Sequence, residues 1–319
     1  MKVLVAPLNW GLGHAARCVP LVNRFLAQGD EVVLGGDGDS LILLQKHFPT
    51  LPVVRLADLS LSYSSGGSQV GAMLRALPKI VRAAWADHRL LGELLDREPF
   101  DLVVSDNRFG LFSRKTRCVY VTHQLHIRLP RMYQWLEPLA ARLHGWVGRH
   151  YAEVWVPDYA EEEKSLSGKL GHPKQQCYGA VRYIGPLSRF EGLIEPMKPS
   201  RIGSFEVVAV LSGLEPQRSM LEQELVSRYV GREERVLIVE GKPSKPMLQA
   251  TKANITIVPY MDDAQLMAVL QQAQRIIARS GYSTIMDLAA LHLLDKAELI
   301  ATPGQSEQEY LARRVEKLP

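Results

Sequence analysis

The chain has 319 residues, 46% hydrophobic and 23% charged, which is a globular composition with enough apolar material for a core. That length favours two domains of ordinary size and excludes a disordered chain. No apolar run reaches the roughly 18–20 residues that cross a bilayer. The formal charge of +4 is too small to indicate a nucleic-acid partner. Three scattered cysteines, Cys18, Cys118 and Cys177, argue against a disulfide framework or zinc site and favour the cytoplasm.

Short apolar, β-branched segments alternate with segments of helical period along the whole chain. The predicted strands are 2–7, 31–35, 101–105 and 118–122, followed after a gap by 206–211, 235–240, 255–258, 275–279 and 298–301. Strands that alternate with helices predict parallel sheets covered by helices on both faces. The run that follows Met1 is too short for a signal-peptide core, so we interpret it as the first strand.

A segment rich in proline and glycine separates the two series of strands, which is typical of a linker. We therefore predict a first domain over 1–187, a linker over 188–202 and a second domain over 203–319. Within the first domain, the polar segment 60–69 is a candidate mobile loop. Pro319 lies about where we expect a last strand and a helix that returns to the first domain; either these elements are dispensable or the chain is shortened.

The first predicted strand ends in a glycine-bearing turn that opens a helix. Gly11 and Gly13 let the backbone approach a ligand, and the free N–H groups of a helix N-terminus favour an anion, typically a phosphate. A tight turn without any ligand is the alternative, but such a turn has no need of an imidazole, and His14 lies within it. The same glycines, with Asp37 downstream, also fit the loose dinucleotide fingerprint, which leaves an NAD-dependent oxidoreductase open.

Two more turns after predicted strands carry small polar residues. Ser212 and Gly213 precede a helix that contains Arg218. Further along, Ser280, Gly281 and Thr284 offer hydroxyl and N–H donors to phosphates, and Asp287 would accept from a ribose diol; Thr284 with Asp287 also matches a simple helix-capping pattern. A polar cluster, 303–310, follows the last strand. Because ligands of open α/β sheets bind at the carboxyl ends of strands, these clusters predict a shared site.

Taken in order, these segments resemble the MurG-like glycosyltransferases. The resemblance rests on Gly11-Leu12-Gly13-His14, where Leu12 interrupts the family's glycines, on Ile184 to Arg189, on Ser212 to Arg218, on Val258 to Asp263, on Arg279 to Asp287, where the family has Glu at the last position, and on Gln308-Glu309-Tyr310, where the family has Gln at Glu309; Thr122-His123-Gln124 is a fainter match. It implies the GT-B fold, in which two Rossmann-like domains with parallel sheets flanked by helices face each other across a cleft.

The resemblance also implies an activity, in which a sugar passes with inversion from a nucleotide-diphosphate donor to a hydroxyl acceptor. The donor would be a UDP-sugar, perhaps UDP-N-acetylglucosamine, and no metal or other cofactor would be needed. His14 is our candidate at the reacting centre, because an imidazole titrates near neutral pH; it would act either as the general base or as a donor to the departing phosphate. Asp106 is the second choice of base. The predicted donor-binding residues are Gly11, Gly13, Arg189, Ser212, Gly213, Arg218, Tyr260, Met261, Ser280, Gly281, Thr284, Asp287, Gln308 and Glu309.

Two acidic pairs receive other interpretations. Asp37-Gly38-Asp39 imitates the Asp-x-Asp of metal-dependent transferases, but its place after the second strand favours a solvated loop. Asp262-Asp263 precedes an apolar helical segment and is predicted to start a helix.

Residues 127–151 combine four arginines with apolar residues at helical spacing, namely Trp135, Leu136, Leu139, Leu143, Trp146 and Val147. A basic amphipathic helix of this kind can rest on the inner face of an anionic membrane and reach a lipid-linked acceptor, perhaps a cell-envelope glycan. The alternative is that the apolar stripe packs on the sheet and the arginines are merely solvated.

Three functions compete with the transferase. An NAD-dependent oxidoreductase would leave the polar clusters of the second domain without a role. A sugar-nucleotide 2-epimerase shares the fold but needs further carboxylates. A nucleotide-sugar-binding protein without turnover is the third. The oligomeric state and the identity of the sugar do not follow from the sequence.

Overall fold

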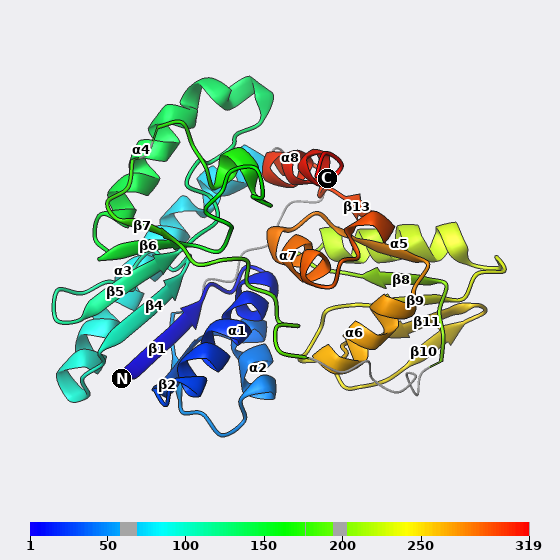
Figure 1. Cartoon of the computed structure of the whole chain (residues 1–319), viewed down its shortest axis with the longest axis horizontal. Helices are drawn as coiled ribbons and strands as arrows, with labels where there is room; N and C mark the ends of the chain where they lie inside the picture. Colours follow the sequence, from blue (N-terminus) through cyan, green and yellow to red (C-terminus); the bar gives the residue numbers. More distant parts are fainter. Residues whose placement is uncertain (58–68, 176, 194–202, 319) are drawn as a thin grey trace.

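The computed structural model describes residues 1–57, 69–175, 177–193 and 203–318, with the backbone alone for 69–74. Most of the predicted loop 60–69 and the linker part 194–202 lie outside the described residues. The described strands form two sheets. The first has seven strands in the order β3-β2-β1-β4-β5-β6-β7, and the second has six in the order β10-β11-β9-β8-β12-β13 (Figure 1).

Helices and strands alternate in both domains. The elements of the first are β1 (Lys2–Pro7), α1 (Gly13–Ala27), β2 (Glu31–Gly36), α2 (Gly38–His47), β3 (Val53–Arg55), α3 (Gln69–Arg97), β4 (Leu102–Asp106), β5 (Arg117–Val121), the 3-10 helix η1 (Arg131–Leu136), α4 (Glu137–Gly148), β6 (Glu153–Val156), η2 (Gly168–Leu170) and β7 (Val181–Tyr183). Those of the second are β8 (Val207–Val210), α5 (Gln217–Tyr229), β9 (Val236–Val239), β10 (Ala250–Lys252), β11 (Ile255–Val258), α6 (Asp263–Gln272), β12 (Arg275–Arg279), α7 (Tyr282–Ala290), η3 (Leu294–Lys296), β13 (Ala297–Ile300) and α8 (Ser306–Val315).

Every predicted strand is confirmed, with ends that agree or differ by a single residue. The pairs are parallel as expected, except that β10 runs antiparallel to β11. The sequence analysis missed β3, β6, β7 and β10. These strands are short, and all but β6 lie at a sheet edge, where few buried apolar residues mark them.

Alternating side chains of each sheet reach two cores. Val3 and Val5 of β1 pack toward α1, whereas Leu4 and Ala6 join the opposite core, as the period of a strand requires. The core beside α1 also contains Ile285, Met286 and Leu311 from α7 and α8 of the second domain. Burial of such side chains contributes about 1.5–3 kcal/mol each, so the domains share a substantial apolar interface.

Polar contacts reinforce this interface. Tyr282 at the start of α7 donates a hydrogen bond to the carbonyl of Pro157 (2.9 Å). The phenolic oxygen of Tyr310 in α8 accepts from the backbone N–H of Lys169 (2.9 Å). Figure 1 shows α7 and α8, in orange and red, on the side of the second domain that faces the first. The carboxyl ends of β1 and β4 therefore lie near the second domain.

Candidate active site

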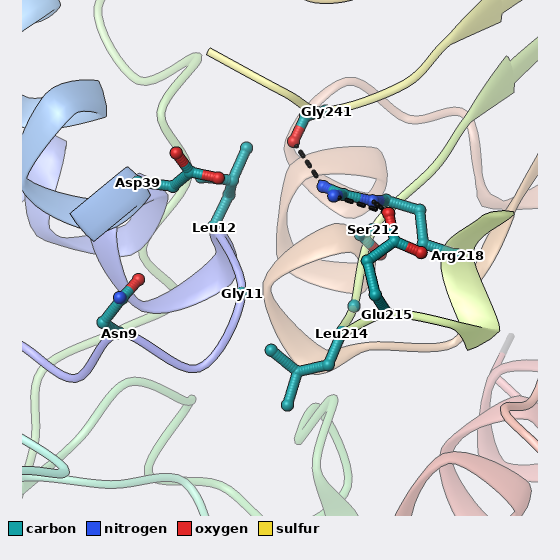
Figure 2. Close-up of a pocket in the computed structure, with 10 residues that line it drawn as sticks. Asn9, Gly11, Leu12, Asp39, Ser212, Leu214, Glu215, Arg218 and Gly241 are labelled. Carbon is teal, nitrogen blue, oxygen red and sulfur yellow. Dashed lines mark hydrogen bonds and ion pairs between the residues drawn. The ribbon is translucent and has the colours of Figure 1, made fainter. Parts of the chain in front are cut away.

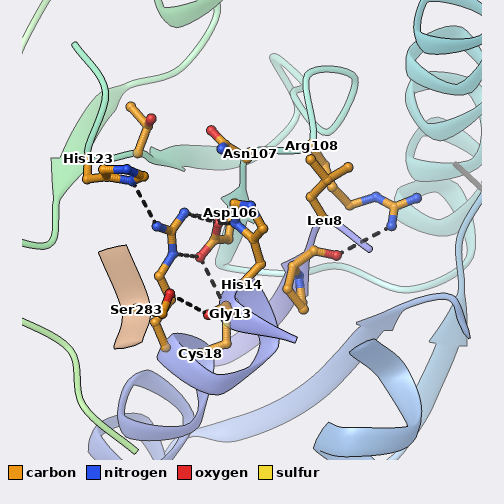
Figure 3. Close-up of polar contacts among 12 residues, drawn as sticks. Leu8, Gly13, His14, Cys18, Asp106, Asn107, Arg108, His123 and Ser283 are labelled. Carbon is orange, nitrogen blue, oxygen red and sulfur yellow. Dashed lines mark hydrogen bonds and ion pairs between the residues drawn. The ribbon is translucent and has the colours of Figure 1, made fainter. Parts of the chain in front are cut away.

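His14 and Asp106 come together at the carboxyl ends of β1 and β4. His14 is the second residue of α1, and Asp106 is the last residue of β4. The Nδ1 atom of His14 lies 2.7 Å from Oδ1 of Asp106 (Figure 3). The carboxylate favours the tautomer that carries its proton on Nδ1, whereas the NH2 group of Arg17, 3.0 Å from the same atom, opposes it. With the proton on Nδ1, Nε2 has the free lone pair that a base needs. The His14 side chain is 14% exposed, so a substrate can reach it.

Arg17 also holds the carboxylate of Asp106. Its Nε and NH2 groups bond the two carboxylate oxygens as a fork. Both Arg17 and Asp106 are buried, and the thiol of Cys18 also contacts Asp106. Both oxygens of the buried carboxylate are thus bonded to Arg17, and one of them also contacts His14, which is the arrangement of a group that orients His14.

The pKa values of the pair follow from this arrangement. Burial raises the pKa of Asp106, but the charges of Arg17 and His14 outweigh that effect and hold it well below its usual range. Burial, aided by the charge of Arg17, lowers the pKa of His14 from its ordinary 6.5, although Asp106 opposes the shift. His14 is therefore neutral at pH 7 and ready to accept a proton.

The network continues into the second domain through His123, which follows β5. The NH1 group of Arg17 lies 3.2 Å from Nδ1 of His123, and Nε2 of His123 lies 2.7 Å from the Glu307 carboxylate of α8. Since Arg17 is only a donor, Nδ1 accepts and Nε2 donates to Glu307. His123 also stacks on Tyr282 of α7, with ring centroids 4.3 Å apart. His14 is thereby connected to the opposite domain.

The two predicted glycine loops face each other across a pocket. Figure 2 shows Asn9, Gly11, Leu12 and Asp39 of the first domain opposite residues of the second. The second-domain lining is Ser212, Gly213, Leu214, Glu215, Arg218 and Gly241. Gly11 and Gly213 have positive φ angles of 76° and 96°, which glycine adopts without strain. A Cβ atom on Gly11 would lie 3.6 Å from the Cα atom of Gly213, so the loops approach closely.

The pocket has the features of a diphosphate site on one wall. It lies beside the N-terminus of α5, and Arg218 reaches the carbonyl of Gly241 (2.9 Å). The carboxylate of Glu215 also bonds Arg218, and Asp39 lines the first-domain side. A bound diphosphate would have to displace Glu215 from Arg218 or use the remaining N–H groups.

Gly13 contacts the start of α7, because the hydroxyl of Ser283 donates to the carbonyl of Gly13 (2.8 Å). Gly281 and Thr284, also near the start of α7, remain partly exposed. The helix starts at Tyr282 with Gly281 as its N-cap, so the capping pattern read at Thr284 is wrong. The helix start predicted at Asp262-Asp263 is confirmed, because Asp262 caps α6 through the N–H of Gln265.

Other predicted donor residues have structural partners. The hydroxyl of Ser280 is buried and donates to the carbonyl of Gln308 (2.9 Å), while the side-chain oxygen of Gln308 accepts from the N–H of Thr302 (2.8 Å). Met261 is packed in the core of the second domain. Tyr260 is buried against the first-domain core, with the ammonium of Lys46 over its ring. The exposed Glu309 lines a different pocket.

Asp287 and Arg189 bond each other instead of lining the glycine-loop pocket. Asp287 is buried in α7 and accepts from the Ser188 hydroxyl (2.8 Å) and from Arg189 Nε (3.1 Å). Arg189 also pairs with Asp263 at 3.6 Å. These contacts attach the residues after β7 to the second domain. The predicted roles of Asp287 at a ribose and of Arg189 at a diphosphate find no support in this arrangement.

The interpretation of Asp37 as a solvated loop residue is wrong. Asp37 is buried, and its carboxylate pairs with Arg108 (2.6 Å) and accepts from Asn9 (3.1 Å). Arg108 in turn bonds Asp87 of α3. Because Asp37 is saturated in this way, it is not free to bind the ribose of a dinucleotide. Among the described residues, no group of three or more His, Cys, Asp or Glu side chains is arranged to hold a metal.

The sequence analysis missed Arg17 and Glu307 as members of the site. Arg17 reads as an ordinary helical arginine, and Glu307 as one of several acidic residues in the first turn of α8. The available signal was position, since Arg17 lies one turn after His14 on the same helix face. His123 was noticed only through the faint family match at Thr122 to Gln124.

The amphipathic segment forms η1 and α4 and exposes its apolar side chains. Met132, Trp135, Leu139, Leu143 and Trp146, which we term the α4 stripe, are all exposed, and Trp135 is 75% exposed. The alternative that the stripe packs on the sheet is therefore wrong for these residues. Over the described part of the chain, no helix has the length and apolar character to span a membrane.

Comparisons with known proteins agree with this architecture. No family model matches the chain. Two curated relatives from Methanosarcina acetivorans and Methanosarcina mazei, both described as uncharacterised glycosyltransferases, are 24% and 23% identical over 99% of this chain and 84% of each relative.

Several solved structures share the fold. A calicheamicin glycosyltransferase superposes with a TM-score of 0.57 at 14% identity, covering 99% of this chain and 89% of its own. A glycosyltransferase from Streptomyces nogalater gives 0.54 at 16% identity, with 100% and 96% covered. A putative UDP-N-acetylglucosamine 2-epimerase from Listeria monocytogenes gives 0.57 at 13% identity, with 100% and 87% covered. The chain has the GT-B fold.

Proposed function

We propose that this protein is an inverting glycosyltransferase that moves a sugar from a nucleotide-diphosphate donor to a hydroxyl acceptor. The observation that carries the proposal is the His14–Asp106 pair together with a pocket built from the glycine loops of both domains, since Gly11 and Leu12 of the turn that leads to His14 line that pocket. The names of the Methanosarcina relatives support the same reaction class.

His14 acts as the general base in this proposal. Its Nε2 atom removes the proton of the acceptor hydroxyl as the oxygen attacks the anomeric carbon from the side opposite the leaving diphosphate. The C–O bond to the diphosphate breaks in the same step, which inverts the configuration. Asp106, held by Arg17, stabilises the imidazolium that forms. A base of this kind contributes roughly 10²–10⁴-fold in rate.

The donor occupies the glycine-loop pocket. The N-terminus of α5 and the guanidinium of Arg218 lie where the departing diphosphate gathers negative charge. Fixed dipoles and one cation take the place of a metal ion in this scheme, so we propose metal-independent transfer. The MurG resemblance favours UDP, and UDP-N-acetylglucosamine is the donor we would test first. A related fold from Arabidopsis thaliana, at 14% identity and a TM-score of 0.55, is described in complex with UDP-L-rhamnose.

His14→Ala tests the assignment. We expect transfer from radiolabelled UDP-sugar to fall by about 10²–10⁴-fold, while UDP still raises the melting temperature, because the base acts in the transition state. The matched control is His172→Ala, whose ring stacks on Tyr183 outside the site. Full turnover by the His14 variant would disprove the mechanism.

Thermal shift with UDP, GDP and NAD separates the competing functions. Stabilisation by UDP alone supports the transferase, and stabilisation by NAD supports an oxidoreductase. Donor binding without transfer or hydrolysis across a panel of acceptors supports a binding protein. Conversion of the donor to its C2 epimer identifies an epimerase, a function with the same fold.

The α4 stripe extends the proposal to a peripheral contact with the inner face of the cell membrane, where a lipid-linked acceptor would be found. Its tryptophans and leucines are exposed beside Arg131, Arg142 and Arg149, a combination that suits an anionic lipid surface. Co-sedimentation with anionic vesicles should fall in Trp135→Ala/Trp146→Ala and be weak for neutral vesicles. Vesicle binding that depends neither on the two tryptophans nor on the charge of the lipid would refute the membrane contact.

A further inference from the structure

A second pocket lies at the domain boundary, away from the glycine loops. From the first domain it is lined by residues of the segment that leads into and through η1, and from the second by Gly304 and by residues along α8 from Ser306 to Arg313. Its charged lining groups are Arg128, Arg131, Arg313 and Glu309. Three positive charges and one negative charge leave a formal charge of +2 on one small surface.

The three arginines are available to a ligand. Among the described ion pairs none joins Arg128, Arg131 or Arg313 to a carboxylate. The Arg128 guanidinium lies over the Tyr310 ring, 4.9 Å from its centroid, which orients the group without neutralising it. Arg313 donates only to the backbone carbonyl of Glu309 (3.1 Å). Guanidinium groups of this kind bind phosphate oxygens through paired hydrogen bonds.

The first turn of α8 adds to the same field. The helix starts at Ser306, and its N-cap Gln305 makes no capping hydrogen bond through its side chain. Because Ser306 lines the pocket, the positive end of the helix dipole lies at the pocket, partly offset by Glu307 and Glu309 in the same turn. Ser306 donates to the carbonyl of Arg128 (2.7 Å), which fixes the two walls relative to each other.

The pocket and His14 lie at the same interface between the domains. Glu307, next to Ser306 in α8, bonds His123, and His123 bonds Arg17 beside His14. A molecule that fills the pocket therefore contacts both domains, and the chain of contacts from Glu307 through His123 and Arg17 connects this region to His14. Met132 and Trp135, which follow Arg131 in η1, add exposed apolar surface at its edge.

We propose that this pocket, the Arg128 pocket, is a subsite for a phosphate group carried by the acceptor. The identification of the ligand as the acceptor rests on the proposed function, whereas the phosphate site itself rests on the charges and the helix terminus. The phosphate group belongs either to a soluble phosphate ester or to a lipid headgroup that also contacts the α4 stripe.

Binding of inorganic pyrophosphate tests the site without turnover. Calorimetry is performed with saturating UDP present, so that the glycine-loop pocket is occupied. Arg128→Gln/Arg131→Gln should weaken pyrophosphate binding by about tenfold or more, because two charged hydrogen-bonding groups are lost. Arg142→Gln/Arg149→Gln removes the same charge from exposed positions outside the pocket and should leave the affinity unchanged. Equal weakening in both variants, or none in the first, overturns the proposal.

Vesicles distinguish the two sources of phosphate. A loss of binding to phosphatidylcholine vesicles that contain phosphatidic acid that is larger in the Arg128/Arg131 variant than in the Arg142/Arg149 variant indicates a lipid headgroup. Unchanged vesicle binding together with weakened pyrophosphate binding indicates a soluble ester. Because neither assay needs transfer, an intact phosphate site in a protein with no transferase activity would refute the function and keep the site. Sugar transfer together with unaltered pyrophosphate binding in the Arg128/Arg131 variant would refute the phosphate site and keep the proposed function.

Discussion

The polar clusters at the strand ends of the two domains look alike in sequence but differ in what their side chains are free to do. In the first domain, Asp106 and Arg17 neutralise each other and leave a partly exposed imidazole, His14, at the edge of the cluster. In the second domain, Ser280 and Asp287 are buried and bonded to neighbouring chain segments. A polar residue at a strand end is thus a candidate for chemistry only when its partners leave one of its atoms unpaired.

The largest effect we expect is on catalysis, from Asp106→Asn. The amide cannot stabilise the imidazolium, so the rate should fall by about 10²–10⁴-fold. Burial and Arg17 lower the pKa of His14, and Asp106 opposes them. Loss of the Asp106 carboxylate therefore lowers the pKa of His14 further, and the acid limb of the pH–rate profile moves to lower pH. Asp96→Asn, at an exposed ion pair, is the control. An unchanged pH–rate profile would show that Asp106 does not affect the pKa of His14, and would contradict the difference between the two polar clusters.

The next effect is on stability, from Arg108→Met. This change leaves Asp37 and Asp87 buried without their shared cation, which costs about 3–5 kcal/mol in the free energy of unfolding. The control Arg89→Met breaks an exposed pair with Glu93 and should cost less than about 1 kcal/mol. Similar urea midpoints for the two variants would show that the buried cluster is not structural.

Asp287→Asn directly tests the interpretation of the second-domain cluster. We expect a loss of about 1–3 kcal/mol in stability, because Ser188 and Arg189 lose a charged acceptor. The affinity for UDP, measured by calorimetry, should stay the same. A large loss of UDP affinity with unchanged stability would instead restore the ribose contact that the sequence indicated.

The smallest effect concerns the interdomain pair of His47 in α2 with Asp263 in α6, 2.7 Å apart. Burial lowers the pKa of His47, but the hydrogen bond and charge of Asp263 outweigh it and raise the pKa above 6.5. The pair therefore stabilises the fold fully below about pH 6.5, and the contribution is lost as the pH rises through the raised value. His47→Gln should cost about 1 kcal/mol at acidic pH and less at alkaline pH, measured by urea unfolding. A loss that is independent of pH would contradict this interpretation.

Much of the fold followed from local patterns. The strands 255–258 and 275–279 were placed without error, because their apolar runs end at polar turns that depend on neighbouring residues alone. The predicted approach of the two glycine loops was also found at Gly11 and Gly213. The domain limits 1–187 and 203–319 stay predictions, although the strands of the first sheet end at Tyr183 and those of the second begin at Val207.

The site was predicted less completely, for a reason that Arg17 illustrates. An arginine within a helix is usually solvated, yet Arg17 is 1% exposed because Asp106 meets it from a strand 89 residues away. A larger separation in sequence, 184 residues, hid the contact of His123 with Glu307. Conversely, Met261 and Asp287 matched family positions but are packed or bonded within the fold.

The sequence by itself determined the alternation of strands and helices, the two glycine loops and the presence of an imidazole beside the first of them, because these depend on side-chain period and backbone freedom over a few residues. Only the tertiary structure decided which polar groups are hydrogen-bonded or ion-paired to partners and which remain free. A hydrogen bond or ion pair saturates an atom only when a distant segment delivers the matching group, and that delivery is set by how the two sheets and their helices pack.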